Sequence, residues 1–146
     1  MDARTICWLD AEHRIDADTE RELRRVITDH DHPPAVLVPT HGDWQPRNWL
    51  LDDEGQVHVI DLGRAALRPA LTDLARLARQ EWEGRPALEA AFLVGYGTDP
   101  REPGAWQRTL LREAIGTAVW AYQVGDERFE HQGHRMIRQA LATIGN

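Results

Sequence analysis

The sequence has no lysine, one cysteine and no long apolar run, and each absence narrows the class of protein. All seventeen basic side chains are arginine. The single cysteine, Cys7, excludes an internal disulfide and is compatible with a reducing compartment. No apolar stretch approaches the roughly 20 residues of a membrane span, and residues 1–14 lack the apolar centre of a signal peptide. Together these absences predict a cytoplasmic protein.

Positive charge is also in short supply. The 17 arginines face 24 acidic residues, which gives a formal net charge of −7. A nucleic-acid partner would require a basic face, so that class is excluded. The acidic balance suits a cationic small molecule, although many acidic proteins bind none. With 42% hydrophobic and 28% charged residues, the chain can form one packed domain, which we predict to span residues 1–146.

Hydrophobic spacing predicts helices in most of the chain. Apolar residues recur at helical spacing in residues 16–31, 72–82, 86–97, 104–124 and 126–144. The first of these helices is expected to begin near Asp18, where Thr19 and Glu22 fit a capping box, and to end before Pro33. Residues 35–38 form a short apolar run that suits a strand or a buried approach to the next loop.

The centre of the chain is predicted to be a β-hairpin. Residues 48–51 and 56–61 are short extended runs, joined by an acidic turn that ends in glycine. The turn carries Asp52, Asp53 and Glu54, whose spacing does not match a calcium loop and is typical of a solvated hairpin tip. The predicted fold class is α+β, mostly helical, with one small central β-hairpin and no separate sheet domain.

Two motifs flank this hairpin and contain the residue types that phosphoryl transfer needs. HGDWQPRN, residues 41–48, fits the kinase catalytic-loop pattern H-x-D-x-x-x-x-N, and VIDLG, residues 59–63, lies where kinases keep D-F-G. In that template Asp43 is the base that accepts the proton of the attacking hydroxyl. Asn48 and Asp61 supply the hard oxygen ligands that Mg²⁺ prefers. As ordinary structural residues, the three would instead be turn and cap positions.

The amino-acid sequences of both motifs resemble those of aminoglycoside phosphotransferases and choline-kinase-like enzymes. HGDWQPRNWLL has their glycine in place of the protein-kinase arginine, and VIDLGRAALRPALTDLARL has their metal aspartate followed by an aspartate–leucine pair that opens a helix. The resemblance covers most of residues 41–77. It implies a protein-kinase-like C-terminal lobe, in which His41, Gly42 and Gly63 have structural roles at the site. It also implies Mg²⁺ and transfer of the γ-phosphate of ATP or GTP to a hydroxyl of a small molecule, often an antibiotic.

The same resemblance implies an N-terminal lobe, with a β-sheet, a phosphate-covering loop and a phosphate-pairing lysine. Only forty residues precede His41, they are predicted to be mostly helical, and the chain has no lysine. We therefore expect a C-terminal lobe without its N-terminal lobe, either as a fragment or as a short natural protein, with little or no turnover alone. A second copy or another partner is expected to cover the exposed surface near Trp8, Trp44 and Trp49.

Two other classes of function compete with a kinase. A metal hydrolase could use His41, Asp43, His58 and Asp61 as ligands, but it leaves Asn48 and Gly63 unexplained. His58 is expected to alternate outward on its strand, and the pair His131 and His134 has no evident third ligand. The second rival is a non-catalytic kinase-like interaction module, which the absence of the N-terminal lobe favours directly. Carboxylates such as Glu81, Glu83 and Glu113 suit either a cationic substrate or solvated helix faces.

Overall fold

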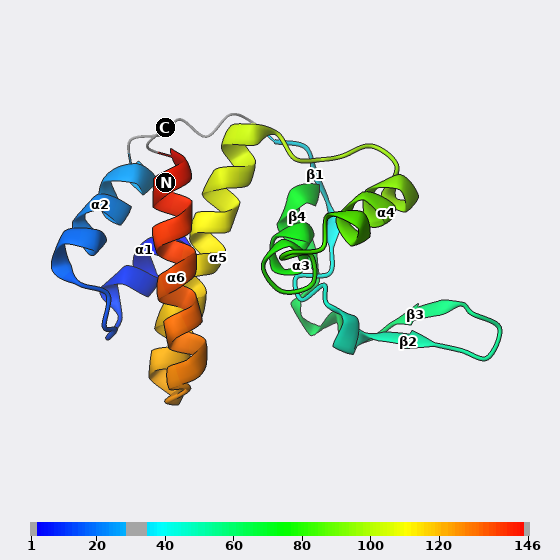
Figure 1. Ribbon diagram of the computed structural model, residues 1–146, viewed down its shortest axis with the longest axis horizontal. Coiled ribbons are helices and arrows are strands. Elements are labelled where there is room, and N and C mark those ends of the chain that lie inside the picture. Colours follow the sequence, from blue (N-terminus) through cyan, green and yellow to red (C-terminus); the bar gives the residue numbers. More distant parts are fainter. Residues whose placement is uncertain (1–2, 29–34, 145–146) are drawn as a thin grey trace. The chain divides into compact units, whose positions relative to one another are not determined.

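The computed structural model describes residues 3–28 and 35–144, and it divides into two compact units. One unit combines residues 1–33 with residues 103–146, and the other spans residues 34–102. Figure 1 shows the helices and strands of both. The prediction of a single domain over the whole chain stays a prediction. In the described ranges, no helix is long and apolar enough to cross a membrane.

The first unit contains helices and no strands in its described residues. It contains α1 (Ala3–Asp10), α2 (Ala17–Thr28), α5 (Pro103–Val124) and α6 (Glu127–Ile144). The N-cap of α2 differs from the predicted capping box: the carboxylate of Asp16, rather than Thr19, accepts a backbone N–H bond, from Thr19 at 2.9 Å. The predicted end of this helix at Pro33 lies outside the described residues. The core of the unit is formed by side chains such as Leu23, Ile115, Val119 and Ile137.

The close packing of α5 against α6 depends on a glycine. Gly133 of α6 faces Ala118 of α5 so closely that a Cβ at Gly133 would lie 2.5 Å from the Ala118 nitrogen. Between the two helices, Gly125 has a φ of 75°, which a glycine adopts without strain. The side chain of Asp126 then accepts the N–H of Phe129 at 3.0 Å and caps α6. These features fold the two helices into an antiparallel pair (Figure 1).

The second unit contains two small antiparallel sheets, two α-helices and three short 3-10 helices (Pro46–Asn48, Leu62–Arg64 and Ala70–Asp73) in its described residues. The strands are β1 (Leu37–Thr40), β2 (Trp49–Leu51), β3 (Val57–Val59) and β4 (Ala66–Pro69), followed by α3 (Leu74–Gln80) and α4 (Pro86–Tyr96). The predicted hairpin is confirmed as β2 paired with β3, with Trp49 opposite Val59. A second two-stranded sheet, in which β1 pairs antiparallel with the distant β4, was not predicted from the sequence.

The pairing of β1 with β4 positions the two motif loops. It sets Thr40, the last residue of β1, opposite Ala66, the first residue of β4. The Thr40 hydroxyl donates to the Ala66 carbonyl at 2.8 Å and accepts from Arg68 at 2.9 Å. The loop that follows β1 therefore starts beside the segment that connects β3 to β4. The two predicted catalytic motifs, residues 41–48 and 59–63, therefore connect to the same end of the β1–β4 sheet.

Candidate active site

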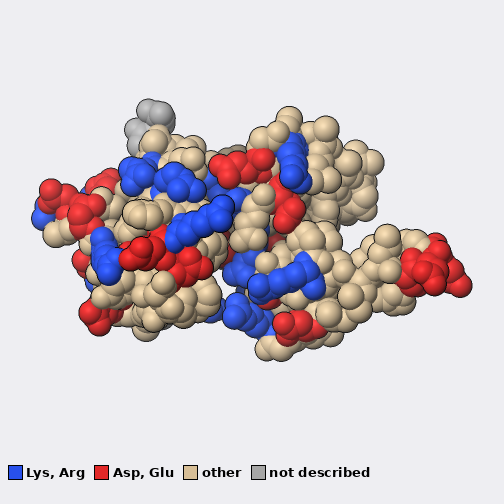
Figure 2. All heavy atoms as spheres, turned by 60° about the horizontal axis from the view of Figure 1, so that its bottom comes forward, with Lys and Arg blue, Asp and Glu red and all other residues tan. Residues whose placement is uncertain are grey.

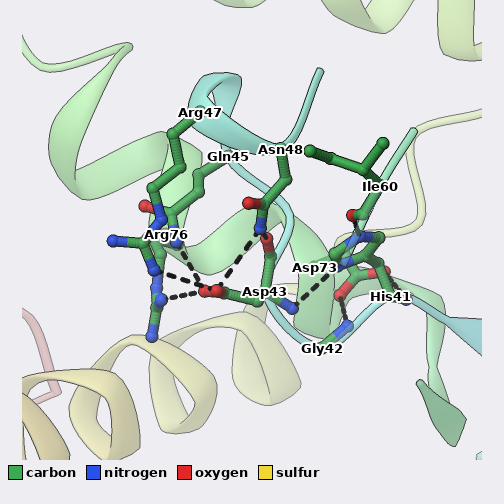
Figure 3. A network of polar contacts seen from close by, with 9 residues as sticks. All are labelled: His41, Gly42, Asp43, Gln45, Arg47, Asn48, Ile60, Asp73 and Arg76. Atoms are coloured by element: carbon green, nitrogen blue, oxygen red, sulfur yellow. Dashed lines mark hydrogen bonds and ion pairs between the residues drawn. The ribbon is translucent and has the colours of Figure 1, made fainter. Parts of the chain in front are cut away.

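Asp73, at the start of α3, holds the first motif loop by its backbone. Its Oδ2 accepts the N–H of His41 at 2.6 Å, and its Oδ1 accepts the N–H of Gly42 at 2.8 Å (Figure 3). Gly42 has a φ of 79°, and a Cβ there would collide with the carbonyl oxygen of Arg64. The sequence HGD at the beginning of the loop is therefore constrained by α3 from one side and by the residue after Gly63 from the other.

His41 links the two motif loops through its ring. Its Nδ1 accepts the backbone N–H of Asp43 at 3.2 Å, so the neutral ring carries its proton on Nε2. That Nε2 then donates to the carbonyl oxygen of Ile60 at 2.8 Å. Both ring nitrogens are engaged inside the chain, which agrees with a structural role for His41 and leaves neither nitrogen for a metal.

The carboxylate of Asp43 is buried and accepts hydrogen bonds on both oxygens. Oδ1 receives the amide of Gln45 at 2.5 Å and the guanidinium of Arg76. Oδ2 receives Arg47 at 3.0 Å and the amide of Asn48 at a longer 3.4 Å. Burial alone would raise the pKa of Asp43. The hydrogen bond from Arg47 and the charges of the two arginines outweigh that effect and hold the pKa below its ordinary value, so the group is an anion near neutral pH.

Asn48 lies directly against Asp43 in the folded loop. Its side-chain NH₂ donates to the backbone carbonyl of Asp43 at 2.8 Å. The amide oxygen of Asn48 is therefore the atom with which it can bind a metal. The backbone carbonyl of Asn48 accepts the N–H of Ile60 at 3.0 Å, which places Asp61 one residue beyond the cross-strand neighbour of Asn48.

Asp61 differs from the other two motif residues in its exposure. Its backbone is left-handed, with φ 61° and ψ 57°, and its side chain is exposed. A Cβ on Gly63 would lie 3.6 Å from the Asp61 carboxylate, so the glycine leaves room beside that oxygen. In the described part of the chain, no hydrogen bond joins Asp61 to Asp43 or Asn48. The structure thus joins Asp43 and Asn48 directly, whereas Asp61 is linked to Asn48 only through the backbone of the preceding residue, Ile60.

Four residues of this network were not identified from the sequence as part of it. Gln45 and Arg47 occupy variable positions of the motif, where the pattern specifies no residue type. Asp73 was noted only as the start of a helix, within the aspartate–leucine pair. Arg76 reaches Asp43 from α3, 33 residues further along the chain, and no local spacing signals such a contact.

The geometry does not favour a metal-hydrolase site. No group of three or more His, Cys, Asp or Glu within residues 3–28 and 35–144 is arranged to hold a metal ion. His58 is exposed and its Nε2 lies 2.7 Å from Asp52 Oδ2 at the hairpin tip; Val57 and Val59 are exposed as well, so β3 does not show the predicted alternation. On α6, His134 lies 3.5 Å from the Glu130 carboxylate, while its neighbour His131 is exposed.

Comparison with known proteins yields matches in sequence and in structure. A family model described as "Phosphotransferase enzyme family" matches residues 1–109. The chain is 32% identical over 74 residues to an aminoglycoside 3'-phosphotransferase from Salmonella typhimurium, a match that covers 51% of this chain and 27% of that enzyme. It is also similar to the crystal structure of choline kinase LicA from Streptococcus pneumoniae, with a TM-score of 0.74 at 14% identity.

The structural match covers 96% of this chain and 53% of the choline kinase. The chain therefore spans about half the length of that structure, and its 74 matched residues span about a quarter of the curated enzyme. The predicted fold class, a mostly helical α+β fold of the kinase C-terminal-lobe type, is confirmed by this likeness. No lobe with a larger sheet is present in the described ranges, where the strands form two two-stranded sheets.

Proposed function

Because the chain belongs to the phosphotransferase enzyme family, whose model matches residues 1–109, we propose that it is the catalytic half of a small-molecule kinase. The reaction is transfer of the γ-phosphate of ATP or GTP to a hydroxyl group. The observation that carries the proposal is the contact between Asp43 and Asn48 in one constrained loop, with Asp61 adjacent across the hairpin. The acceptor is a small molecule such as an aminoglycoside, consistent with the relative's name and with the net charge of −7.

Asp43 acts on the acceptor in this proposal. Its carboxylate accepts the hydrogen bond of the attacking hydroxyl, orients the oxygen and takes up its proton as the new P–O bond forms. The bonds from Gln45 and Arg76 fix the carboxylate from one side, and Asp73 fixes the backbone on which it is carried (Figure 3). Phosphoryl transfer depends mainly on positioning and charge, so a rigidly held anion suits this role.

Asn48 and Asp61 have the chemistry to bind Mg²⁺. The NH₂ of Asn48 is used within the chain, which presents its amide oxygen as the ligand, and the Asp61 carboxylate is exposed beside Gly63. One amide oxygen and one carboxylate are a donor set that Mg²⁺ accepts together with water and phosphate oxygens. When bound, the metal offsets the negative charge of the phosphates. Both residues lie in segments that the hairpin backbone holds together.

We propose that activity also requires an N-terminal lobe with a phosphate-covering loop. Apolar side chains on the hairpin support this requirement, because Leu50 is 52%, Leu51 71% and Val57 59% exposed. Figure 2 shows acidic residues gathered at the hairpin tip, while the stem of the hairpin is uncharged. Such an apolar surface is usually covered by another part of a protein.

A partner that covers surface near Trp8, Trp44 and Trp49 stays a prediction. Trp8, Trp44 and Trp49 are all half-buried, and the rings of the last two are 5.1 Å apart. The more exposed apolar surface is formed by the hairpin side chains. An N-terminal lobe, a second copy of the chain or another protein would cover it. The same surface favours the second candidate function, a non-catalytic kinase-like interaction module.

A titration with Mg²⁺ and a non-hydrolysable ATP analogue separates the two functions. It compares this chain with a longer version in which a β-sheet lobe bearing a lysine precedes it. A kinase half should bind the nucleotide weakly alone and clearly more tightly in the longer version, in a manner that depends on Asn48 and Asp61. If the longer version does not bind nucleotide in the presence of Mg²⁺, the interaction module is the better description.

A further inference from the structure

The carboxylate of Asp43 has no acceptor position left for a substrate. An ionised carboxylate offers about four lone-pair directions. Gln45, Arg47, Asn48 and Arg76 each donate a hydrogen bond to it, two donors to each oxygen. A substrate hydroxyl can therefore reach the carboxylate only after one of these four donors has left.

The four donors are not equally replaceable. Gln45 and Asn48 are buried, and the NH₂ of Asn48 is held by the Asp43 carbonyl as well. The side chain of Arg76 is 26% exposed, whereas that of Arg47 is 68% exposed. An ion pair with one exposed, flexible partner contributes little to stability and is readily exchanged. Arg47 is thus the donor that leaves at the smallest cost, and its departure opens Oδ2.

The charge balance gives Arg47 an alternative partner. Two guanidinium groups meet the carboxylate of Asp43, so Asp43 stays paired with Arg76 when Arg47 leaves. Elsewhere in the chain there is no lysine that could pair with a phosphate. Arg47 donates a single hydrogen bond to Asp43, although a guanidinium has five N–H groups in a planar fork that matches phosphate oxygens.

We propose that Arg47 is a phosphate-binding residue that rests on Asp43 until a polyphosphate is present. It turns to the phosphates of the donor, and the same movement frees Asp43 Oδ2 for the acceptor hydroxyl. The ligand class is a polyphosphate chain, as in a nucleoside triphosphate. This inference rests on the proposed function and adds to it a residue that couples phosphate binding to release of the base. Figure 3 shows the resting position of Arg47 beside Asp43.

Inorganic tripolyphosphate with EDTA tests the inference without a metal, a nucleotide or turnover. Isothermal titration measures its affinity for the chain and for Arg47→Gln. The matched control is Arg21→Gln. Arg21 pairs with Asp18, three residues away, and its side chain is 75% exposed, so this variant also removes an exposed arginine from a local ion pair. Arg47→Gln should weaken binding about tenfold, as loss of one charge-assisted contact does, and Arg21→Gln should not change it.

A second variant tests the resting contact with Asp43. Asp43→Asn removes the negative charge that competes with phosphate for Arg47, so tripolyphosphate should bind about tenfold more tightly. The double variant with Arg47→Gln should lose that gain. Should Asp43→Asn fail to fold, the comparison of Arg47→Gln with Arg21→Gln decides alone.

Three results would overturn the inference: equal affinities of Arg47→Gln and the unchanged chain, no gain in a folded Asp43→Asn, or no measurable binding of tripolyphosphate. Each would make Arg47 a structural partner of Asp43 only. None of them touches the proposed function, which depends on Mg²⁺–nucleotide binding in the longer version. The tripolyphosphate titration therefore tests the role of Arg47, and the nucleotide titration of the longer version tests separately whether the protein is a kinase.

Discussion

Gly42→Ala tests whether the first motif loop packs as tightly as the structure indicates. Gly42 and Gly55 have nearly the same left-handed backbone, with φ of 79° and 80°. A Cβ at Gly55 would meet nothing within 4 Å, whereas a Cβ at Gly42 would collide with the Arg64 carbonyl and approach the Arg68 guanidinium to 2.8 Å. Gly55→Ala is therefore a control for the backbone cost alone.

The two substitutions should differ by the cost of that collision. A left-handed backbone costs an alanine about 1 kcal/mol, which both variants share. Forcing a methyl group against a backbone carbonyl adds about 2 kcal/mol, because the carbonyl cannot rotate away as a side chain can. Gly42→Ala should lower the free energy of unfolding by about 3 kcal/mol and Gly55→Ala by about 1 kcal/mol. Urea denaturation measures both, and equal losses would refute the close approach of the loop to Arg64.

Two further variants test the rest of the fold. Gly133→Ala should lower the free energy of unfolding by about 1–2 kcal/mol. The added methyl group clashes with the Ala118 backbone, and this clash costs more than the roughly 1 kcal/mol that alanine adds to helix stability. A higher free energy of unfolding, measured by denaturation, would contradict the packing of α5 on α6. The hydrogen bond from Arg101 lowers the pKa of Asp99 in the folded chain below its ordinary value of 3.8. The ionised carboxylate therefore stabilises the fold at pH values above 3.8, and this stabilisation is lost as the pH falls through the pKa of the folded state. Asp99→Asn should therefore make the thermal midpoint less sensitive to pH below 3.8, and an unchanged acid sensitivity would argue against the ion pair of Asp99 with Arg101.

The features that the sequence predicted correctly have local signals. The hairpin follows from two short apolar runs around the turn at Asp52, and the helices after residue 70 follow from their apolar spacing. Asp43 and Asn48 were found because a five-residue spacing within one loop is a pattern that can be recognised in a sequence. Their roles in catalysis and metal binding stay predictions.

The features that were missed depend on contacts between distant residues. β4 pairs with β1 across 26 residues or more, and its exposed Leu67 gives it no alternating pattern that would identify a half-buried strand. Arg76 is one arginine among seventeen, and only the fold brings it to Asp43. The cap of α2 was misplaced by one turn because Asp16 and Thr19 both have suitable side chains at helix starts.

The most direct test of the central claim is γ-phosphate transfer by the version that carries an N-terminal lobe. Radiolabelled ATP, Mg²⁺ and a panel of aminoglycosides are incubated with that protein, with its Asp43→Asn variant and with the control Arg21→Gln. We expect a phosphorylated product that requires Mg²⁺, is unchanged in Arg21→Gln and falls by at least about a hundredfold in Asp43→Asn, the range for loss of a catalytic base. Transfer that persists in Asp43→Asn at the rate of the control would contradict the assignment of the active site.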